Sequence, residues 1–562
     1  MKFNDMPYSR VNIEEVCRKY DSLTKTVKNA GCEHCVFRAI DEHEKIQRRV
    51  STMSTIAYVR HSINTKDEFY DKENEFYDSE GPVLSEAVQN FMNSLLESKY
   101  LPKLKEKYGE LLFINMEMEQ KTFKPEIIPQ LQKENALVTE YQKLIASAQI
   151  EFDGKVLTTA QLAPYKEDPD REVRKGAYFA DGKYYMDNAP ELDRIFDELV
   201  KVRTEIAHAL GFKSFTELAY LRRTRNCYTP EMVAKFREQV VEDIVPIVSS
   251  LKEMQAKRIG MAKEDMRIYD DGFKYKEGNP KPHGSPKDIL AAGRRMYEEM
   301  SPETAEFIGF MYDNELLDVE AKPGKAVGGY CTEIPEYRSP FIFSNFNGTA
   351  GDVDVLTHEA GHAYAAYRNM DSELLETSQP TMESCECHSM SMEFLAWPWL
   401  DLYYKEDADR ARFSHLESAL NFIPYGCLVD HFQHVVYDNP NLTPEERNKK
   451  WDELSAIYRP YLRADGVPFW GEGRSWQRQL HIYHYPFYYI DYCLAQTVSL
   501  MFWELSQKDY KDAWRRYNAF VSEGGRKTFV ELCRVAGIKT PFEDGSLKDI
   551  ASVAKAWLDE RK

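Results

Sequence analysis

The sequence predicts a mainly helical protein, because its apolar residues recur at helical spacing through most of its length. The segment from Asn188 to Gly211 is an example, since a capping residue and Pro190 begin it and a glycine ends it. Its apolar positions at this spacing are Leu192, Ile195, Phe196 and Leu199. No apolar stretch approaches the ~20 residues of a membrane span, so we expect no membrane partner.

Two short segments are predicted to form strands. Ile150–Leu157 has a turn signal at Asp153–Gly154 between two short apolar runs, which favours a small hairpin. Pro340–Phe346 is apolar and ends at Asn347–Gly348, a strong turn signal. This strand is either internal to a small sheet or an exposed edge that pairs with an extended peptide backbone.

Composition argues against several classes of function. The 562 residues carry a net charge of −19, and Lys and Arg are dispersed among more numerous Asp and Glu. Without a basic stripe, we expect no nucleic-acid partner.

Met1–Pro7 lacks the apolar core of a secretory signal, and ten scattered cysteines are typical of reduced thiols. We therefore expect a cytoplasmic protein.

The most informative motif is His358-Glu359-Ala360-Gly361-His362. Residues four apart share a helix face, so both imidazoles reach one ion while Glu359 lies beside a water bound there. Two histidines also occur together in helices by chance. Apolar residues at helical spacing on both sides place the motif inside a helix, and the pattern is typical of zinc hydrolases.

A catalytic zinc site needs a third protein ligand, and the next segment offers several. Pro380–Trp397 has no glycine and is predicted to form a second helix packed on the first. Glu386 and Glu393 lie two helical turns apart on one face, among methionine and aromatic residues. We choose Glu386 as the third ligand. The other candidates in this segment are Glu383, Glu393, Cys385, Cys387 and His388.

Three separated blocks carry a family pattern: Phe341–His362, Glu386–Glu393 and His481–Tyr492. Together they resemble the thimet oligopeptidase and oligoendopeptidase F group of zinc peptidases, and within it the Pz-peptidase-like oligoendopeptidases. This resemblance implies a two-lobed helical ellipsoid with a deep central channel and a small β-sheet beside the zinc-binding helices. It also favours an edge position for Pro340–Phe346.

The same resemblance assigns roles to the first two blocks. It implies that one Zn²⁺ ion is bound by His358, His362 and Glu386. It implies further that Glu359 activates the attacking water and that Glu393 supports the ligands. The geometry of the motif and the resemblance therefore agree.

By resemblance, His481 stabilises the tetrahedral intermediate, and Tyr489 and Tyr492 match the tyrosines that follow it. The spacing from His481 to the tyrosines is one residue shorter than in the thimet branch, and a second histidine, His484, is easily mistaken for the functional one. The residues alone favour a different interpretation, in which this aromatic run is a packing face.

These features predict a zinc-dependent endopeptidase that hydrolyses internal bonds of short, unstructured oligopeptides. One alternative is a zinc dipeptidyl carboxypeptidase or other exopeptidase, with Arg474 or Arg478 as the anchor for the substrate carboxylate. The other is an inactive peptide-binding protein, against which Glu359 argues. We divide the chain approximately into an amino-terminal helical lobe, 1–200, and a catalytic lobe, 201–562, or else one continuous domain. The oligomeric state is not specified by the sequence.

Cys32–Cys35 contains two thiols at the spacing of half a structural zinc site. The chain offers no second half, because the only other close pair, Cys385 and Cys387, lies on the predicted ligand helix. A second metal ion at Cys32 and Cys35 is therefore not favoured.

Overall fold

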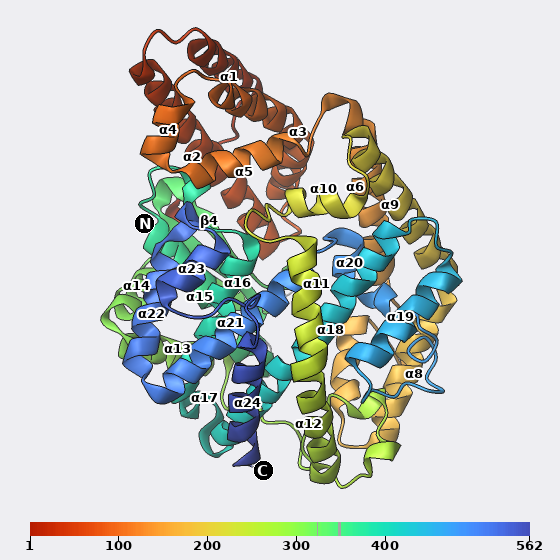
Figure 1. Cartoon of the computed structure of the whole chain (residues 1–562). Coiled ribbons are helices and arrows are strands. Elements are labelled where there is room, and N and C mark those ends of the chain that lie inside the picture. Colours follow the sequence, from red (N-terminus) through yellow and green to blue (C-terminus); the bar gives the residue numbers. More distant parts are fainter. Residues whose placement is uncertain (323, 327, 347–349, 562) are drawn as a thin grey trace. The chain divides into compact units, whose positions relative to one another are not determined.

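The computed structural model describes residues 1–322, 324–326, 328–346 and 350–561, and helices dominate this part of the chain (Figure 1). Its strands form two small sheets, one of order β1-β2 and one of order β3-β5-β4. The predicted mainly helical class is therefore confirmed. Among the described helices, none combines the length and apolar character that a bilayer span requires. The predicted turn at Asn347–Gly348 lies outside the described residues.

Two compact units make up the chain, and each is assembled from three separate segments. The first unit comprises Met1–Gln120, Lys281–Asp409 and Val498–Ile538. The second comprises Lys121–Pro280, Arg410–Thr497 and Lys539–Lys562. The division at residue 200 and the central channel both stay predictions.

The first unit holds the larger sheet, with β3 (Leu317–Glu320), β4 (Tyr330–Ile334) and β5 (Ser339–Phe346). Its helices are α1 (Ile13–Lys28), α2 (Glu33–Ile63), α3 (Glu68–Leu96), α4 (Leu101–Tyr108), α5 (Glu110–Gln120), α13 (Pro286–Met300), α14 (Pro302–Asp313), α15 (Ala350–Asn369), α16 (Met382–Leu395), α17 (Asp401–Tyr404), α22 (Tyr510–Ser522) and α23 (Phe529–Ala536). Both α2 and α15 pack against β4.

The second unit holds the hairpin β1 (Ile150–Phe152) and β2 (Lys155–Leu157). Its helices are α6 (Ile128–Ala146), α7 (Thr159–Leu162), α8 (Arg171–Asp187), α9 (Ala189–Ala209), α10 (Phe215–Arg222), α11 (Pro230–Gln239), α12 (Val245–Arg258), α18 (Ala408–Asp438), α19 (Pro444–Tyr458), α20 (Leu480–His484), α21 (Tyr489–Lys508) and α24 (Ser546–Asp559). Segments of α18 and α21 also belong to the first unit.

Two local predictions are confirmed in the second unit. The helix expected between Asn188 and Gly211 is α9, and its four predicted apolar positions are all buried. The hairpin expected at Ile150–Leu157 pairs β1 with β2 in antiparallel register. Its turn residues Asp153 and Gly154 have φ values of 51° and 68°, the left-handed conformation that a two-residue hairpin turn requires.

The family-favoured edge position of Pro340–Phe346 is wrong. This segment lies within β5, which pairs with β3 on one side in parallel and with β4 on the other in antiparallel register. Seven of the eight positions of β5 are buried. A continuous apolar run without alternation favours such a strand, because both of its faces are covered. The edge strand next to it is β4.

Candidate active site

The candidate metal ligands come from α15 and α16, which pack closely against each other. Gly361 lies at the point of close approach. A Cβ atom at this position would lie 2.6 Å from the His388 carbonyl oxygen and 2.7 Å from Ser389 Cα. The glycine inside the motif therefore allows the second helix to approach the two histidines.

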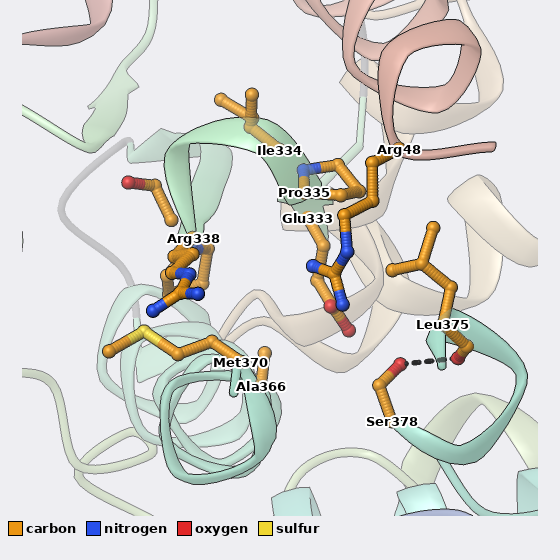
Figure 2. Close-up of a pocket in the computed structure, with 11 residues that line it drawn as sticks. Arg48, Glu333, Ile334, Pro335, Arg338, Ala366, Met370, Leu375 and Ser378 are labelled. Carbon is orange, nitrogen blue, oxygen red and sulfur yellow. Dashed lines mark hydrogen bonds between the residues drawn. The ribbon is translucent and has the colours of Figure 1, made fainter. Parts of the chain in front are cut away.

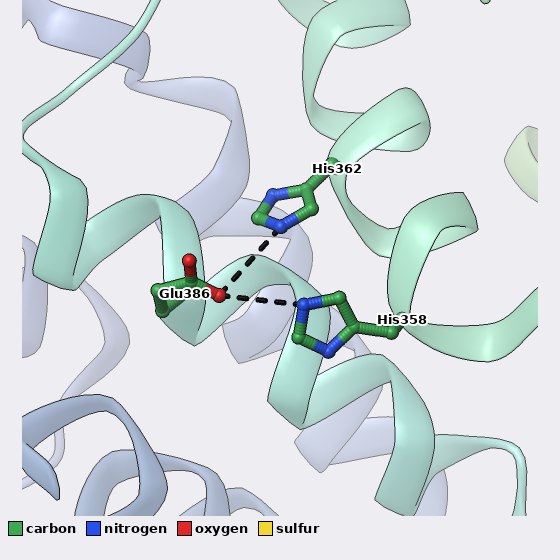
Figure 3. A group of neighbouring side chains, drawn as sticks. All are labelled: His358, His362 and Glu386. Atoms are coloured by element: carbon green, nitrogen blue, oxygen red, sulfur yellow. Dashed lines mark ion pairs between the residues drawn. The ribbon is translucent and has the colours of Figure 1, made fainter. Parts of the chain in front are cut away.

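Three side chains of these helices form a compact cluster (Figure 3). The Nε2 atoms of His358 and His362 lie 3.4 Å and 3.6 Å from Glu386 Oε2. The Glu386 side chain is only 5% exposed, whereas the histidine side chains are 26% and 22% exposed. The carboxylate is therefore held within the helix packing, and the imidazoles retain access to solvent.

This cluster fits a zinc ion. A tetrahedral ion with bonds of about 2.0–2.2 Å separates its ligand atoms by about 3.3–3.6 Å, and the two measured separations, 3.4 Å and 3.6 Å, fall in this range. Two imidazoles and one carboxylate are typical ligands of catalytic zinc, which keeps one further position for water or substrate. Within the described residues, no other group of three such side chains has this arrangement.

Neighbouring residues orient the cluster. His358 Nδ1 lies 2.7 Å from Glu393 Oε1 and donates to it, so that Nε2 is directed toward Glu386. Ser389 Oγ donates to Glu386 Oε2 at 3.1 Å. The resemblance had implied the support from Glu393, but the contribution of the Ser389 hydroxyl emerges only from the helix geometry.

The two histidines differ in their protonation. Burial opposes the charge on His358, but hydrogen bonds to Glu386 and Glu393 raise its pKa well above the usual value. Burial lowers the pKa of His362 to about 4, so this imidazole is neutral near pH 7. A metal ion bound by this cluster would therefore displace a proton from His358, whereas the His362 imidazole would already be neutral.

Glu359 lies beside His358 on α15 and is only 9% exposed. In the metal-free protein, burial raises the pKa of Glu359 to about 7, although the charge of His358 partly opposes this shift. A backbone hydrogen bond from Cys331 also reaches the Glu359 carboxylate. Because Cys331 belongs to β4, the edge strand and the motif helix are adjacent at this residue.

Three other candidates on α16 lie outside this group of three residues. Glu383 accepts a hydrogen bond from Thr381 Oγ1 at 2.6 Å, and Cys385 Sγ lies 3.5 Å from the Pro380 carbonyl oxygen. His388 is buried, and neither of its ring nitrogens has a hydrogen-bond partner within the described residues. Burial lowers the pKa of His388 to about 3. Among the candidates, only Glu386 joins both histidines.

The remaining predicted residues lie in the second unit, on α20 and the first turn of α21. The ring centroid of His481 is 5.0 Å from that of Tyr489 and 6.0 Å from that of Tyr492. Burial raises the pKa of Tyr489 well above its usual value, so its hydroxyl remains protonated. His484 instead stacks on Tyr485 at 3.8 Å. The structure thus brings the three predicted residues together, whereas the ring contact of His484 is with Tyr485.

Two residues that the sequence analysis missed orient His481. The Gln479 side-chain amide donates to His481 Nδ1 at 2.8 Å, and the Tyr425 hydroxyl donates to Gln479 Oε1 at 2.7 Å. With Nδ1 accepting, the hydrogen of the neutral imidazole lies on Nε2. Tyr425 lies 54 residues before Gln479, on α18, so no local sequence pattern indicates this contact.

A cavity of about 840 Å³ lies within the second unit and is lined in part by Tyr425, Trp470 and Arg478. The Arg478 guanidinium lies 4.8 Å from the Trp470 ring centroid, and it forms no ion pair within the described residues. Arg474, the other suggested carboxylate anchor, pairs with Asp193 at 3.0 Å. Of the two arginines, the structure therefore leaves Arg478 available.

A second, much smaller cavity of about 10 Å³ lies in the first unit, where the end of β4 meets α2 and α15 (Figure 2). Arg48 and Glu333 border it, and Gln379 donates to Glu333 Oε1 at 2.5 Å. This volume is close to the minimum for one water molecule. It is a packing gap beneath the edge strand and has no room for a peptide.

Comparison with known proteins gives a consistent family assignment. Residues 3–123 match the peptidase M3 N-terminal domain, and residues 164–285 and 303–552 match peptidase family M3. Oligopeptidase PepF of Bacillus subtilis (strain 168) is 22% identical over 534 residues, which cover 90% of this chain and 77% of that protein.

Solved structures agree with this assignment. A structure of Pz peptidase A with inhibitor 2 has a TM-score of 0.94 and 46% identity, and the match covers 100% of this chain and 99% of that one. Oligoendopeptidase-F from Enterococcus faecium shares the fold, with a TM-score of 0.65 at 16% identity, over 98% of this chain and 97% of that one. The predicted family is confirmed: the chain belongs to peptidase family M3 and is a metallopeptidase, a hydrolase of peptide bonds.

Proposed function

We propose that this peptidase is a zinc-dependent endopeptidase that cleaves internal bonds of short, unstructured oligopeptides. The observation that carries this proposal is the cluster of His358, His362 and Glu386 with Glu359 beside it on the same helix. The name of one relative, an oligopeptidase, supports the substrate class. The ten cysteines, all of them free, support activity in a reducing compartment such as the cytoplasm.

In this proposal His358, His362 and Glu386 hold the metal. When bound there, a zinc ion supplies a Lewis acid that polarises a peptide carbonyl and makes water acidic near neutral pH. Glu393 and Ser389 keep the ligands in their orientation through the hydrogen bonds to His358 and Glu386.

Glu359 is the proposed general base. Its carboxylate accepts a proton from the attacking water and then delivers that proton to the nitrogen of the leaving amine. A carboxylate in a largely buried position performs this exchange well, because burial brings its proton affinity closer to that of the groups it serves. An inactive peptide-binding protein would have no use for such a group, so Glu359 argues against that alternative.

His481, Tyr489 and Tyr492 are the proposed donors to the oxyanion that develops on the substrate carbonyl. Their chemistry supports this role. Nε2 of His481 carries the ring hydrogen when Gln479 occupies Nδ1, and the Tyr489 phenol stays protonated. The Tyr489 hydroxyl makes no hydrogen bond within the described residues, which leaves this donor for a substrate.

The edge strand β4 is the proposed recognition element for the peptide backbone. One side of β4 pairs with β5, and no further strand of the described residues pairs with its other side. An extended peptide that adds to this edge is recognised mainly by backbone hydrogen bonds, which depend little on its side chains. The hydrogen bond from the Cys331 backbone to Glu359 supports this proposal, because it joins Glu359 to this strand.

Cleavage of a short peptide blocked at both ends tests the proposal. We expect internal cuts, found by mass spectrometry, that a chelator abolishes and added zinc restores. The exopeptidase alternative predicts no cutting of the blocked peptide and trimming of the same peptide with free ends. In that case Arg478→Gln should weaken the preference for a free carboxyl terminus, with Arg474→Gln as the paired control.

A further inference from the structure

Two thiols lie together at the beginning of α2, in the first unit. Cys32 is the residue before the helix and has an extended backbone, with φ −151° and ψ 158°, whereas Cys35 lies in the first turn. This change of backbone direction brings the two Sγ atoms to 3.1 Å from each other. Cys32 is exposed and Cys35 is half-buried, so reagents in solution reach the pair.

The surroundings of Cys35 favour a thiolate. The Cys32 thiol is a hydrogen-bond partner of Cys35 Sγ, and the Arg38 guanidinium lies 3.9 Å from it on the next turn. These two contacts lower the pKa of Cys35. The amino-terminal end of the 31-residue helix α2 adds a favourable field for negative charge.

Several other cysteines have raised thiol pKa values and therefore stay protonated more readily than Cys35. Burial raises the pKa of Cys17 on α1, and it does so more strongly for Cys331, Cys385, Cys387 and Cys493. Cys17 is also half-buried, yet it has no second thiol hydrogen-bonded to it within the described residues. Cys35 therefore combines a second thiol close to its own with a lowered thiol pKa.

A metal site explains this pair less well. Cys32 and Cys35 provide two sulfur ligands, but the only group of three close ligands within the described residues is the cluster on α15 and α16. The nearby His34 ring instead contacts the Phe37 ring, at 6.2 Å between centroids. A stable zinc site needs four ligands, and the structure supplies two here.

We propose that Cys32 and Cys35 form a redox-active dithiol that exchanges with small-molecule disulfides of the glutathione type. The Cys35 thiolate attacks one sulfur of the small disulfide and releases one small thiolate. Cys32 then loses its proton to solvent, and its thiolate attacks Cys35 Sγ. This step releases the second small thiol and leaves a Cys32–Cys35 disulfide. Two protein thiols are oxidised, and one small disulfide is reduced to two thiols.

The disulfide closes a loop of only four residues at one helix end, so it constrains nothing farther along the chain. The residues of α2 that contact the β4–β5 region lie much later, for example Thr52, whose Oγ1 accepts from the Glu336 backbone at 2.9 Å. Oxidation should therefore leave peptidase activity unchanged. The dithiol and the proposed peptidase function are independent of each other.

The full-length protein is to be equilibrated with mixtures of reduced and oxidised glutathione, followed by acid quench, alkylation and peptide mass spectrometry. We expect a Cys32–Cys35 disulfide in the wild type. In Cys32→Ser we expect glutathione trapped on Cys35, at least about tenfold faster than at Cys17 in the same sample. In Cys35→Ser the adduct at Cys32 should form slowly, and Cys17→Ser should behave as wild type.

Three results would overturn the proposal. The first is a pair that stays reduced in the most oxidising mixture. The second is a wild type that stops at the glutathione adduct, and the third is a Cys35 that reacts no faster than Cys17. Cleavage of a peptide by the oxidised and reduced wild type, assayed in parallel, reports separately on the peptidase function.

Discussion

The candidate metal cluster and the His481 cluster show two ways in which a folded chain brings predicted site residues together. In the first, His358, His362 and Glu386 come from two consecutive helices within about thirty residues, and helix periodicity aligns them. In the second, His481 owes its orientation to Gln479 and to Tyr425, which comes from a different helix. The first arrangement is local in sequence, and the second depends on tertiary packing.

The two clusters should therefore respond differently to substitution. Each residue of the candidate metal cluster owes its role to its position on a helix face. Its substitution should therefore remove metal binding and leave the fold intact. A residue of the His481 cluster combines packing with chemistry, since its rings lie against one another at 5–6 Å. The following predictions test this contrast.

Glu359→Gln should have the largest effect. We expect kcat to fall by up to about 10⁴-fold, because the amide cannot accept or return the proton. Bound zinc, measured by mass spectrometry of the metal, should remain stoichiometric, since Glu359 is not a proposed ligand. Substantial residual turnover at full zinc occupancy would remove Glu359 from the role of base.

Glu386→Gln should weaken zinc binding by more than about 100-fold, since even the partners behind metal ligands contribute about 10–100-fold. Metal content after dialysis against a competing chelator provides the measurement. Glu383→Gln, three residues earlier on α16, is the matched control and should retain zinc. Equal retention by both variants would exclude Glu386 as a ligand.

Tyr489→Phe should lower kcat by about 10²-fold with little change in KM, because an oxyanion donor acts mainly in the transition state. Tyr492→Phe provides the comparison within the cluster, and Tyr485→Phe, which stacks on His484, is the control outside it. Normal kcat in Tyr489→Phe would return this residue to a packing role and sharpen the contrast between the two regions.

Gly361→Ala should have the smallest effect on chemistry and act on the fold. The added methyl group meets the backbone of α16, so we expect a loss of about 1–3 kcal/mol in the free energy of unfolding. Urea denaturation provides the measurement, with Ala360→Gly as a control at the preceding position. An unchanged stability would show that the two helices separate easily and that the cluster is less rigid than the packing indicates.

Much of the site follows from local pattern. The helix of the motif, the second helix and the choice of Glu386 all rest on a period of 3.6 residues, and the structure has this arrangement. The local sequence pattern did not predict the position of β5 within its sheet. Its apolar run indicated a strand, but its place between β3 and β4 depends on partners elsewhere in the chain, so the edge position favoured by resemblance was wrong.

Local sequence was enough to predict the helical class, the hairpin at Asp153–Gly154 and the helical histidine motif, because these depend on backbone preferences and periodicity over a few residues. Packing between distant segments defines which strand forms the sheet edge and which residues orient His481, and the folded backbone sets how near Cys32 Sγ lies to Cys35 Sγ. Those features depend on distances and directions that a linear pattern does not contain. Packing selects them from several arrangements that satisfy the same local preferences.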